Sequence, residues 1–241
     1  VTAVFQDDVD LVRARQLVAE RLVGLPQLPA GVETPELGPL TGGLGEIFHF
    51  AVEGEGYDAT QILELVELRI APILRSVPGV VEVNTWGGTR RTMDVIGDPI
   101  AMAAHGVSLA ELRAAVSTSS GAVPGDALSA GEGRVLMRGR ALPTQPRDLE
   151  RAVLRAAPGG ETLRIGDVAS VRPGAEPRLG TATAEGRGEG VYVMVQMLRG
   201  ENALEVLEGI HARLPEVRAV LPSGVEIEPI YDRSDLVNAT L

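Results

Sequence analysis

The chain has 241 residues, 44% of them hydrophobic, which is enough for one large domain or two to three small ones with a buried core. Its 33 acidic residues outnumber the 22 basic ones and give a net charge of −11, which argues against nucleic-acid binding because phosphates need a basic surface. Cysteine is absent, so disulfides and thiolate metal sites are excluded.

The first predicted elements form an incomplete β-α-β unit. Val1–Phe5 has the β-branched and aromatic residues of a strand, three aspartates between residues 7 and 10 offer N-caps, and apolar residues at helical spacing predict a helix over Leu11–Leu22. A second strand can follow over Val32–Leu37. Because the chain opens inside a predicted strand, we expect it to be a piece of a longer protein that supplies the partner of this unit.

Two complete β-α-β units follow. The first has a strand over Glu46–Val52, a helix over Asp58–Leu74 and a strand over Val80–Trp86. The second has a strand over Val191–Leu198, a helix over Ala203–Val220 and a strand over Val225–Ile230, and Gly209 and Pro215 predict a kink or break in its helix. Proline and glycine mark the turn from helix to strand in both units, since proline cannot continue a helix and glycine accepts positive φ.

Two such units together make a β-α-β-β-α-β sandwich. One unit alone cannot bury its sheet face, so we expect residues 44–91 and 175–231 to form one four-stranded sheet backed by two helices. The predicted fold class is therefore α+β, with ferredoxin-like split βαβ subdomains and an inserted α+β subdomain.

The insertion is predicted to begin near Arg91 and to end near Gly174. Its expected elements are a strand over Thr92–Val95, helices over Asp98–His105 and Leu109–Val116, a turn at Val123–Gly125, a strand over Arg134–Gly139, a helix over Arg147–Leu154, and a loop and strand over Leu163–Val171. The later glycine-rich segment Gly186–Gly190 lacks the lysine and the following helix of a phosphate loop, so it is predicted to be a hairpin tip.

Seven short segments carry a family resemblance: Ala14–Leu22, Leu37–Phe48, Leu74–Val80, Asn84–Gly88, Ile165–Ala169, Leu198–Ala203 and Tyr231–Leu236. In this order, and over the whole chain, they resemble the first large periplasmic loop of heavy-metal efflux pumps of the resistance–nodulation–division (RND) superfamily, of the cobalt-zinc-cadmium or copper-silver type.

The resemblance implies an organisation into porter and docking subdomains. Residues 1–38 would be a partial first porter subdomain without its N-terminal half, and residues 92–174 an inserted docking subdomain. Residues 39–91 and 175–241 would be the two halves of the second porter subdomain, the latter with the link towards the membrane. No apolar run in the sequence approaches the ~20 residues that span a bilayer, so this piece is expected to be soluble.

The resemblance also implies a function. The chain would be the substrate-pathway and docking portion of a proton-driven cation antiporter, not an enzyme, in the periplasmic part of an inner-membrane protein of a Gram-negative-type bacterium. Its partners would be the other protomers of a homotrimer, a periplasmic membrane-fusion adaptor and an outer-membrane channel. The isolated piece is hypothesised to be monomeric or weakly associated. The alternative is a stand-alone ferredoxin-like binding or assembly module without metal transport.

Candidate metal ligands follow from the same resemblance. Zinc-type relatives place acidic ligands in the second porter subdomain, and Glu46 and Glu82 match that pattern. If their strands start in the same region of the sheet, the two carboxylates form a partial, oxygen-only site for a transported divalent metal such as zinc, completed by ligands from elsewhere. The alternative is that both are solvated acids at strand ends. His49 is a weaker candidate, because strand alternation places it on the face opposite Glu46.

Other polar and soft side chains have structural explanations. His105 and His211 are expected at the surface, and core packing is favoured for at least one of Met194 and Met197, which alternate along one strand. The resemblance to copper-type relatives implies that a thioether site for copper(I) or silver(I) would lie mainly in the second periplasmic loop, outside this chain. Ser117–Ser120 has no histidine and aspartate context for nucleophilic catalysis.

Overall fold

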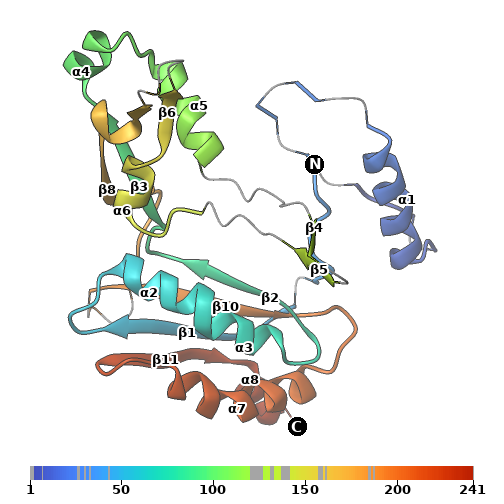
Figure 1. Ribbon diagram of the computed structural model, residues 1–241. Helices are drawn as coiled ribbons and strands as arrows, with labels where there is room; N and C mark the ends of the chain where they lie inside the picture. The colour runs from blue at the N-terminus through green and yellow to red at the C-terminus, as the bar shows by residue number, and fades with distance from the viewer. Residues whose placement is uncertain are drawn as a thin grey trace.

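The computed structural model describes residues 3–6, 8–25, 28–29, 31–32, 34–42, 44–119, 127–130, 133–136, 142–156, 160, 162–183, 186 and 188–240, with only the backbone described for 127–130 and 133–136. Figure 1 shows a sheet with helices on one face and a separate group of helices and strands that the chain enters from the sheet and then leaves.

The main sheet has four long strands: β1 (Glu46–Gly54), β2 (Val80–Trp86), β10 (Glu189–Met197) and β11 (Val225–Asp232). Their spatial order is β11-β1-β10-β2, and every neighbouring pair is antiparallel. Therefore β1 and β2 are parallel with β10 between them, as in a split βαβ unit. This confirms the predicted α+β, ferredoxin-like fold and the pairing of two segments that lie far apart in the sequence.

Two helical segments cover one face of this sheet. The first runs without a break through α2 (Ala59–Leu65), the π-helical η1 (Val66–Ile70) and α3 (Ala71–Arg75), and it begins at Asp58, whose side chain accepts a hydrogen bond from the backbone N–H of Gln61. The second is α7 (Ala203–Ala219). The core between helices and sheet is built almost wholly from Val, Leu and Ile with two phenylalanines, Phe48 and Phe50.

Of the kink or break predicted in α7, a break is not present. The helix continues through Gly209 and Pro215. Four of its side chains on the sheet-facing side are buried: Val206, Leu207, Ile210 and Val217. Because a fully buried aliphatic side chain contributes about 1.5–3 kcal/mol, burial on both sides of Pro215 offsets the ~3 kcal/mol cost of proline inside a helix.

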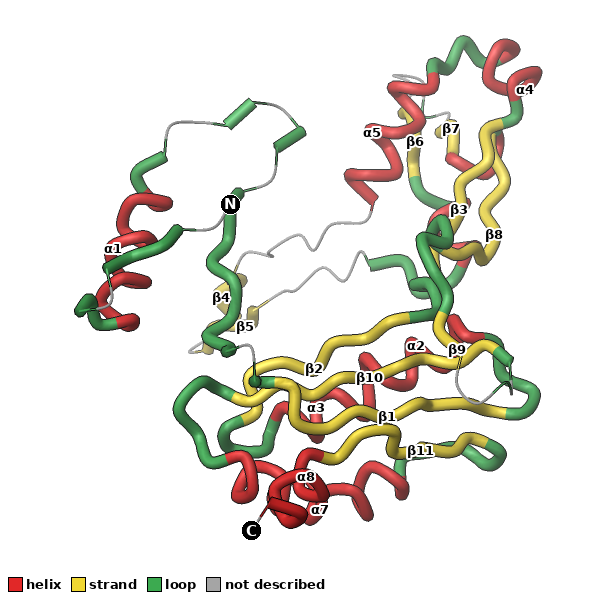
Figure 2. The backbone as a smooth tube through the Cα atoms, turned by 180° about the vertical axis from the view of Figure 1, so that it is seen from behind, coloured by secondary structure: helices red, strands yellow, loops and turns green. Residues whose placement is uncertain are grey.

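No helix of the described part of the chain covers the opposite face of the sheet (Figure 2). Phe48, Phe50 and Val52 of β1 point to the helices, so the alternating residues His49, Ala51 and Glu53 point to this helix-free face. In the view from behind, the four strands lie in front of α2 and α3.

The inserted part has its own core. Strands β3 (Arg91–Gly97) and β8 (Ala169–Ala175) pair along their whole length, and the remaining elements are α4 (Pro99–Ala104), α5 (Leu109–Ser119), the hairpin strands β4 (Ala127–Ala130) and β5 (Gly133–Leu136), α6 (Pro146–Glu150), β6 (Val153–Ala156), β7 (Thr162–Arg164) and the 3-10 turn η2 (Ile165–Asp167). Its buried residues, including Leu112, Leu149 and Ile165, form a cluster separate from the core of the main sheet.

Several predicted boundaries in the insertion change. The helix predicted over Arg147–Leu154 ends at Glu150, because Val153 and Leu154 belong to β6, which pairs with β7. The strand predicted over Arg134–Gly139 is seen as β5 up to Leu136, and its remainder lies outside the described residues, as does the turn at Val123–Gly125. The predicted hairpin tip lies between the two-residue β9 (Ala182–Thr183) and β10, although Glu189 and Gly190 already belong to β10.

In the described residues of the first unit, the helix is the one regular element. The helix α1 (Leu11–Val23) is capped by Asp10, as the sequence suggests, but residues 3–6 are not a strand, and neither are the described residues between 32 and 37. A strand needs a neighbour to satisfy its backbone N–H and C=O groups, and no described segment pairs with either stretch. Accordingly Ala14 alone is buried in α1, while Leu11 and Leu17 remain 40% and 47% exposed.

The last element is α8 (Arg233–Thr240), in the segment predicted to lead towards the membrane. Among the described residues, no helix is both long and apolar enough to cross a bilayer.

Candidate metal-binding site

Glu46 and Glu82 flank the same residue. Gln196 of β10 pairs with Glu46 of β1 on one side and with Glu82 of β2 on the other. Paired residues of neighbouring strands point to the same face, and strands lie about 4.8 Å apart, so the backbones that carry the two glutamates are roughly 10 Å apart on the helix-free face. The predicted common region is therefore present, with one strand between the two carboxylates.

The two carboxylates differ in their surroundings. Glu82 accepts a hydrogen bond of 3.1 Å from the side-chain amide of Asn84, which holds it along β2. The side chain of Glu46 is 52% exposed and lies near His49, with 3.7 Å between Oε2 of Glu46 and Nε2 of His49. Within the described ranges, no group of three acidic or histidine side chains is placed to hold a metal ion. Glu46 and Glu82 thus form at most part of a site.

The position of His49 corrects the sequence prediction. A bulge between Glu46 and Phe48 shifts the register of β1 against β10, and Ile47 and Phe48 are both buried on the helix side. The extra residue breaks the two-residue alternation, so Glu46 and His49 share the helix-free face. His49 is therefore next to Glu46 and not opposite it.

The imidazole of His49 is held on several sides. Nδ1 lies 2.6 Å from the hydroxyl of Tyr192, and the ring centroids of Tyr192 and Tyr231 are 5.6 and 5.0 Å away. The side chain is 13% exposed, and its buried Nε2 has no hydrogen-bond partner in the described part of the chain.

Burial also sets the charge of this group. It lowers the pKa of His49 below its ordinary value, and the nearby Glu46 carboxylate opposes this effect without cancelling it. Burial first, and then the charge of Glu46, raise the pKa of Tyr192. At neutral pH the pair is therefore a neutral imidazole and a neutral hydroxyl, and a neutral imidazole has one lone pair to offer to a cation.

Tyr192 and Tyr231 were missed by sequence reasoning. Together with Trp86 and His49 they form a row of rings across all four strands, with 5.9 Å between the centroids of Trp86 and Tyr192. The alternation of β10 was visible in the sequence, but the ring contacts depend on which residues pair across strands. Only the register of the folded sheet supplies that information.

The methionines of β10 and the two other histidines lie where the sequence predicted, in the core and at the surface. Met194 is buried and Met197 packs against the core of the main sheet, as expected for at least one of them. His105 is exposed and ends α4, and His211 is 41% exposed and contacts Asp232.

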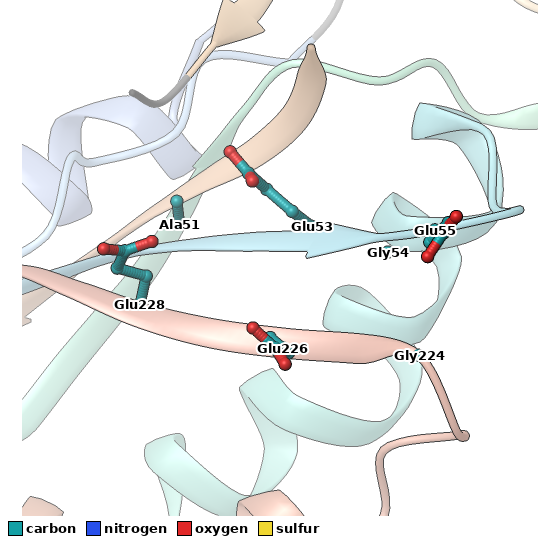
Figure 3. Close-up of a pocket in the computed structure, with 7 residues that line it drawn as sticks. All are labelled: Ala51, Glu53, Gly54, Glu55, Gly224, Glu226 and Glu228. Atoms are coloured by element: carbon teal, nitrogen blue, oxygen red, sulfur yellow. The ribbon is translucent and has the colours of Figure 1, made fainter. Parts of the chain in front are cut away.

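A second acidic surface lies towards the other end of β1. A hollow of about 380 Å³ is lined by Ala51, Glu53, Gly54, Glu55, Gly224, Glu226 and Glu228. In Figure 3 the four carboxylates are spread over the hollow and do not meet at one point. One oxygen of Glu53 is buried without a hydrogen-bond partner among the described residues, while Glu228 does interact with other groups.

Comparisons with known proteins agree over the whole chain. The model of the AcrB/AcrD/AcrF family matches residues 1–241. Protein HelA of Legionella pneumophila is 36% identical over 249 residues, cation efflux system protein CusA of Escherichia coli (strain K12) is 34% identical over 244, and cobalt-zinc-cadmium resistance protein CzcA of Cupriavidus metallidurans is 32% identical over 251. Each match covers 100% of this chain and 23% of the relative, so the chain spans about a quarter of their length.

The fold comparison gives the same result. A crystal structure of a heavy metal efflux pump superposes with a TM-score of 0.84 and 30% identity, covering 98% of this chain and 23% of that one. The resemblance to heavy-metal RND transporters noted in the sequence is confirmed by these matches. The chain belongs to the AcrB/AcrD/AcrF family.

Proposed function

We propose that the chain is the periplasmic substrate-pathway and docking portion of a proton-driven heavy-metal cation efflux pump of the RND superfamily. The relatives include cation efflux and cobalt-zinc-cadmium resistance proteins, and this supports the assignment. In it, residues 39–91 and 175–241 are the second porter subdomain, residues 92–174 the docking subdomain, and residues 1–38 part of the first porter subdomain. The two separate cores of the main sheet and the insertion support this division.

The transported ion in this proposal is a divalent metal such as zinc, and Glu46, Glu82 and His49 are its ligands in this chain. The pairing of Gln196 with both glutamates is the observation that carries it, since that pairing puts two carboxylates on the helix-free face. Carboxylate oxygen and imidazole nitrogen suit borderline divalent ions. The remaining ligands would come from parts of the pump outside this chain.

The proposed partners follow from the same assignment. The pump would be a homotrimer in the inner membrane, joined to a periplasmic adaptor and an outer-membrane channel, with the insertion as the contact region. Rigid-body shifts of the porter subdomains would open and close the path, driven by proton flux through the membrane part. Sedimentation of the 241-residue chain is expected to give a monomer or weak associations, and a stable trimer would contradict this.

A transport assay of the full-length protein tests the metal site. Glu46→Gln and Glu82→Gln keep the size of each side chain and remove its charge. Both are expected to lower zinc export into everted vesicles about tenfold or more, because a neutral amide binds a divalent metal much more weakly than a carboxylate does. The matched control is Glu226→Gln, an exposed glutamate on the same sheet. Unchanged zinc export in both ligand variants would remove these residues from the path.

A further inference from the structure

We infer that Tyr192 is a positioning residue for metal recognition: it holds the imidazole of His49 so that Nε2 and the carboxylate of Glu46 form a mixed nitrogen–oxygen half-site. This inference rests on the proposed function, in which the helix-free face of the sheet binds a divalent metal at this position. It adds a ligand preference to that function, because an imidazole nitrogen favours borderline ions such as zinc over the hard ions calcium and magnesium.

The spacing of the two donors suits one metal ion. Nε2 of His49 and Oε2 of Glu46 are 3.7 Å apart, too far for a strong hydrogen bond. In a tetrahedral zinc site with metal–ligand distances near 2.1 Å, two ligand atoms are roughly 3.4 Å apart. A small movement of the half-exposed Glu46 side chain is therefore enough for both atoms to contact the same ion.

The bulge in β1 is what makes this pair possible. In a strand without the bulge, regular alternation would point His49, three residues after Glu46, to the helices and the core. With the bulge, Glu46 and His49 lie on the same face and can contact each other, although they are three residues apart in the sequence. The half-site is thus a property of the folded strand.

Tyr192 decides which nitrogen is offered. Its hydroxyl occupies Nδ1 at 2.6 Å, while Nε2 is left without a hydrogen-bond partner in the described residues. The ring is 13% exposed and lies against the rings of Tyr192 and Tyr231, so it has little freedom to turn Nδ1 outwards. A hydrogen bond to the distal nitrogen is the usual means by which a protein orients a metal-binding histidine.

The tyrosine hydroxyl also serves both tautomers of a neutral imidazole. In the metal-free chain, Tyr192 donates to Nδ1, and the Nε2–H group faces the negative carboxylate of Glu46. When a metal binds Nε2, the Nε2 proton leaves to solvent and another proton joins Nδ1. The number of protons on the imidazole is therefore unchanged. The Nδ1–H group then donates to the oxygen of Tyr192, because a hydroxyl both donates and accepts.

Nitrogen NMR of the 241-residue chain tests this arrangement. The chain has three histidines, so selective histidine labelling gives few signals. We expect His49 to show the Nε2–H tautomer without metal and the Nδ1–H tautomer with zinc. In Tyr192→Phe, which keeps the ring, we expect a mixture of tautomers without metal and a zinc affinity about tenfold lower, in line with the 10–100-fold effect of lost orienting partners.

Two controls separate positioning from packing and from metal binding itself. Tyr231→Phe removes the other hydroxyl near His49 and is expected to leave zinc affinity within twofold. Calcium affinity is expected to be the same in the two tyrosine variants as in the wild-type chain. A Tyr192→Phe chain with unchanged tautomer and unchanged zinc affinity would overturn the inference while the metal site stands. Zinc that leaves the His49 signals of the wild-type chain unmoved would overturn the inference. If Glu46→Gln also leaves zinc binding unchanged, the proposed site fails with it.

Discussion

Nε2 of His211 and Oδ2 of Asp232 lie 2.6 Å apart and join the middle of α7 to the end of β11. The other carboxylate oxygen of Asp232 accepts hydrogen bonds from the backbone N–H and the hydroxyl of Ser234, at 2.8 and 2.6 Å. The ring of His211 also contacts Phe48 edge-on, with 5.8 Å between centroids. Asp232 therefore ties the start of α8 to the helix layer of the main sheet.

Asp232 should make the stability of the chain depend on pH. Partial burial works to raise its pKa, but the hydrogen bonds from Ser234 and the contact with His211 outweigh burial and place the pKa below the ordinary aspartate value. A lowered pKa in the folded state means stabilisation that is complete above the ordinary value near 4 and is lost as the pH falls through the lower folded value. Asp232→Asn is expected to cost on the order of 1 kcal/mol at pH 7 and less near pH 2, where more of the carboxylate is protonated.

Chemical denaturation of both chains at the two pH values measures this difference. Glu208→Gln removes an exposed carboxylate from α7 and should change the free energy of unfolding by no more than about 0.5 kcal/mol at either pH. A cost of Asp232→Asn that is equal at pH 7 and pH 2 would show that the charge of Asp232 has no part in it.

The core of the main sheet should tolerate truncation poorly. Ile70 is fully buried in η1, so Ile70→Ala removes buried methyl groups, leaves a cavity and is expected to cost about 2–5 kcal/mol. Leu68 is in the same segment and is 65% exposed, so Leu68→Ala should cost no more than about 0.5 kcal/mol. Urea denaturation gives both values, and similar costs for the two variants would contradict the layer arrangement.

The N-terminus of α2 should depend on its capping box. The side chain of Asp58 accepts from the backbone N–H of Gln61, and the side chain of Gln61 accepts from the backbone N–H of Asp58. Asp58→Ala leaves one helix N–H without its partner and is expected to cost about 0.5–2 kcal/mol. Asp58→Ser, measured by the same thermal unfolding, should recover most of that loss, and a serine variant as unstable as the alanine one would argue against capping as the cause.

The main sheet could be predicted because its signals are local and repeated. Alternating apolar residues in β1 and β10, the Asp58 cap and the Pro78–Gly79 turn each indicate their element without knowledge of the rest. Pairing over more than ninety intervening residues followed from the need to bury one sheet face. The strands predicted over Val1–Phe5 and Val32–Leu37 are not seen in the described residues of these ranges for the related reason, since local propensity does not make a strand without a neighbour.

The candidate site was less accessible to sequence reasoning. The shared row of Glu46 and Glu82 was anticipated from strand order and family resemblance, but the face of His49 was wrong because one bulge residue reverses alternation. The contact between Tyr192 and His49 joins residues 143 positions apart, and only the register of β1 against β10 determines it. Local sequence indicates where helices and strands form, whereas these contacts depend on the register in which two strands pair.

The exit from the sheet to the insertion should depend on Gly88. Its φ is +69°, and an added Cβ would overlap the backbone oxygen of Ala59 at the start of α2. Two further contacts hold the segment after β2 against the first helical segment. The hydroxyls of Thr60 and Thr89 form a hydrogen bond of 3.0 Å, and Arg90 and Glu67 form an ion pair of 2.9 Å. Alanine at position 88 must therefore push the crossing segment away from the helix.

Gly106 provides the matched comparison. Its φ of +61° is close to that of Gly88, but nothing lies within 4 Å of an added Cβ. Gly106→Ala should cost about 1–2 kcal/mol for the left-handed backbone alone, and Gly88→Ala should cost about 1–3 kcal/mol more because of the overlap. Thermal and urea unfolding of the two variants measure the difference. Equal costs would mean that the segment after β2 moves freely relative to α2, and that the insertion is not held against the sheet at this crossing.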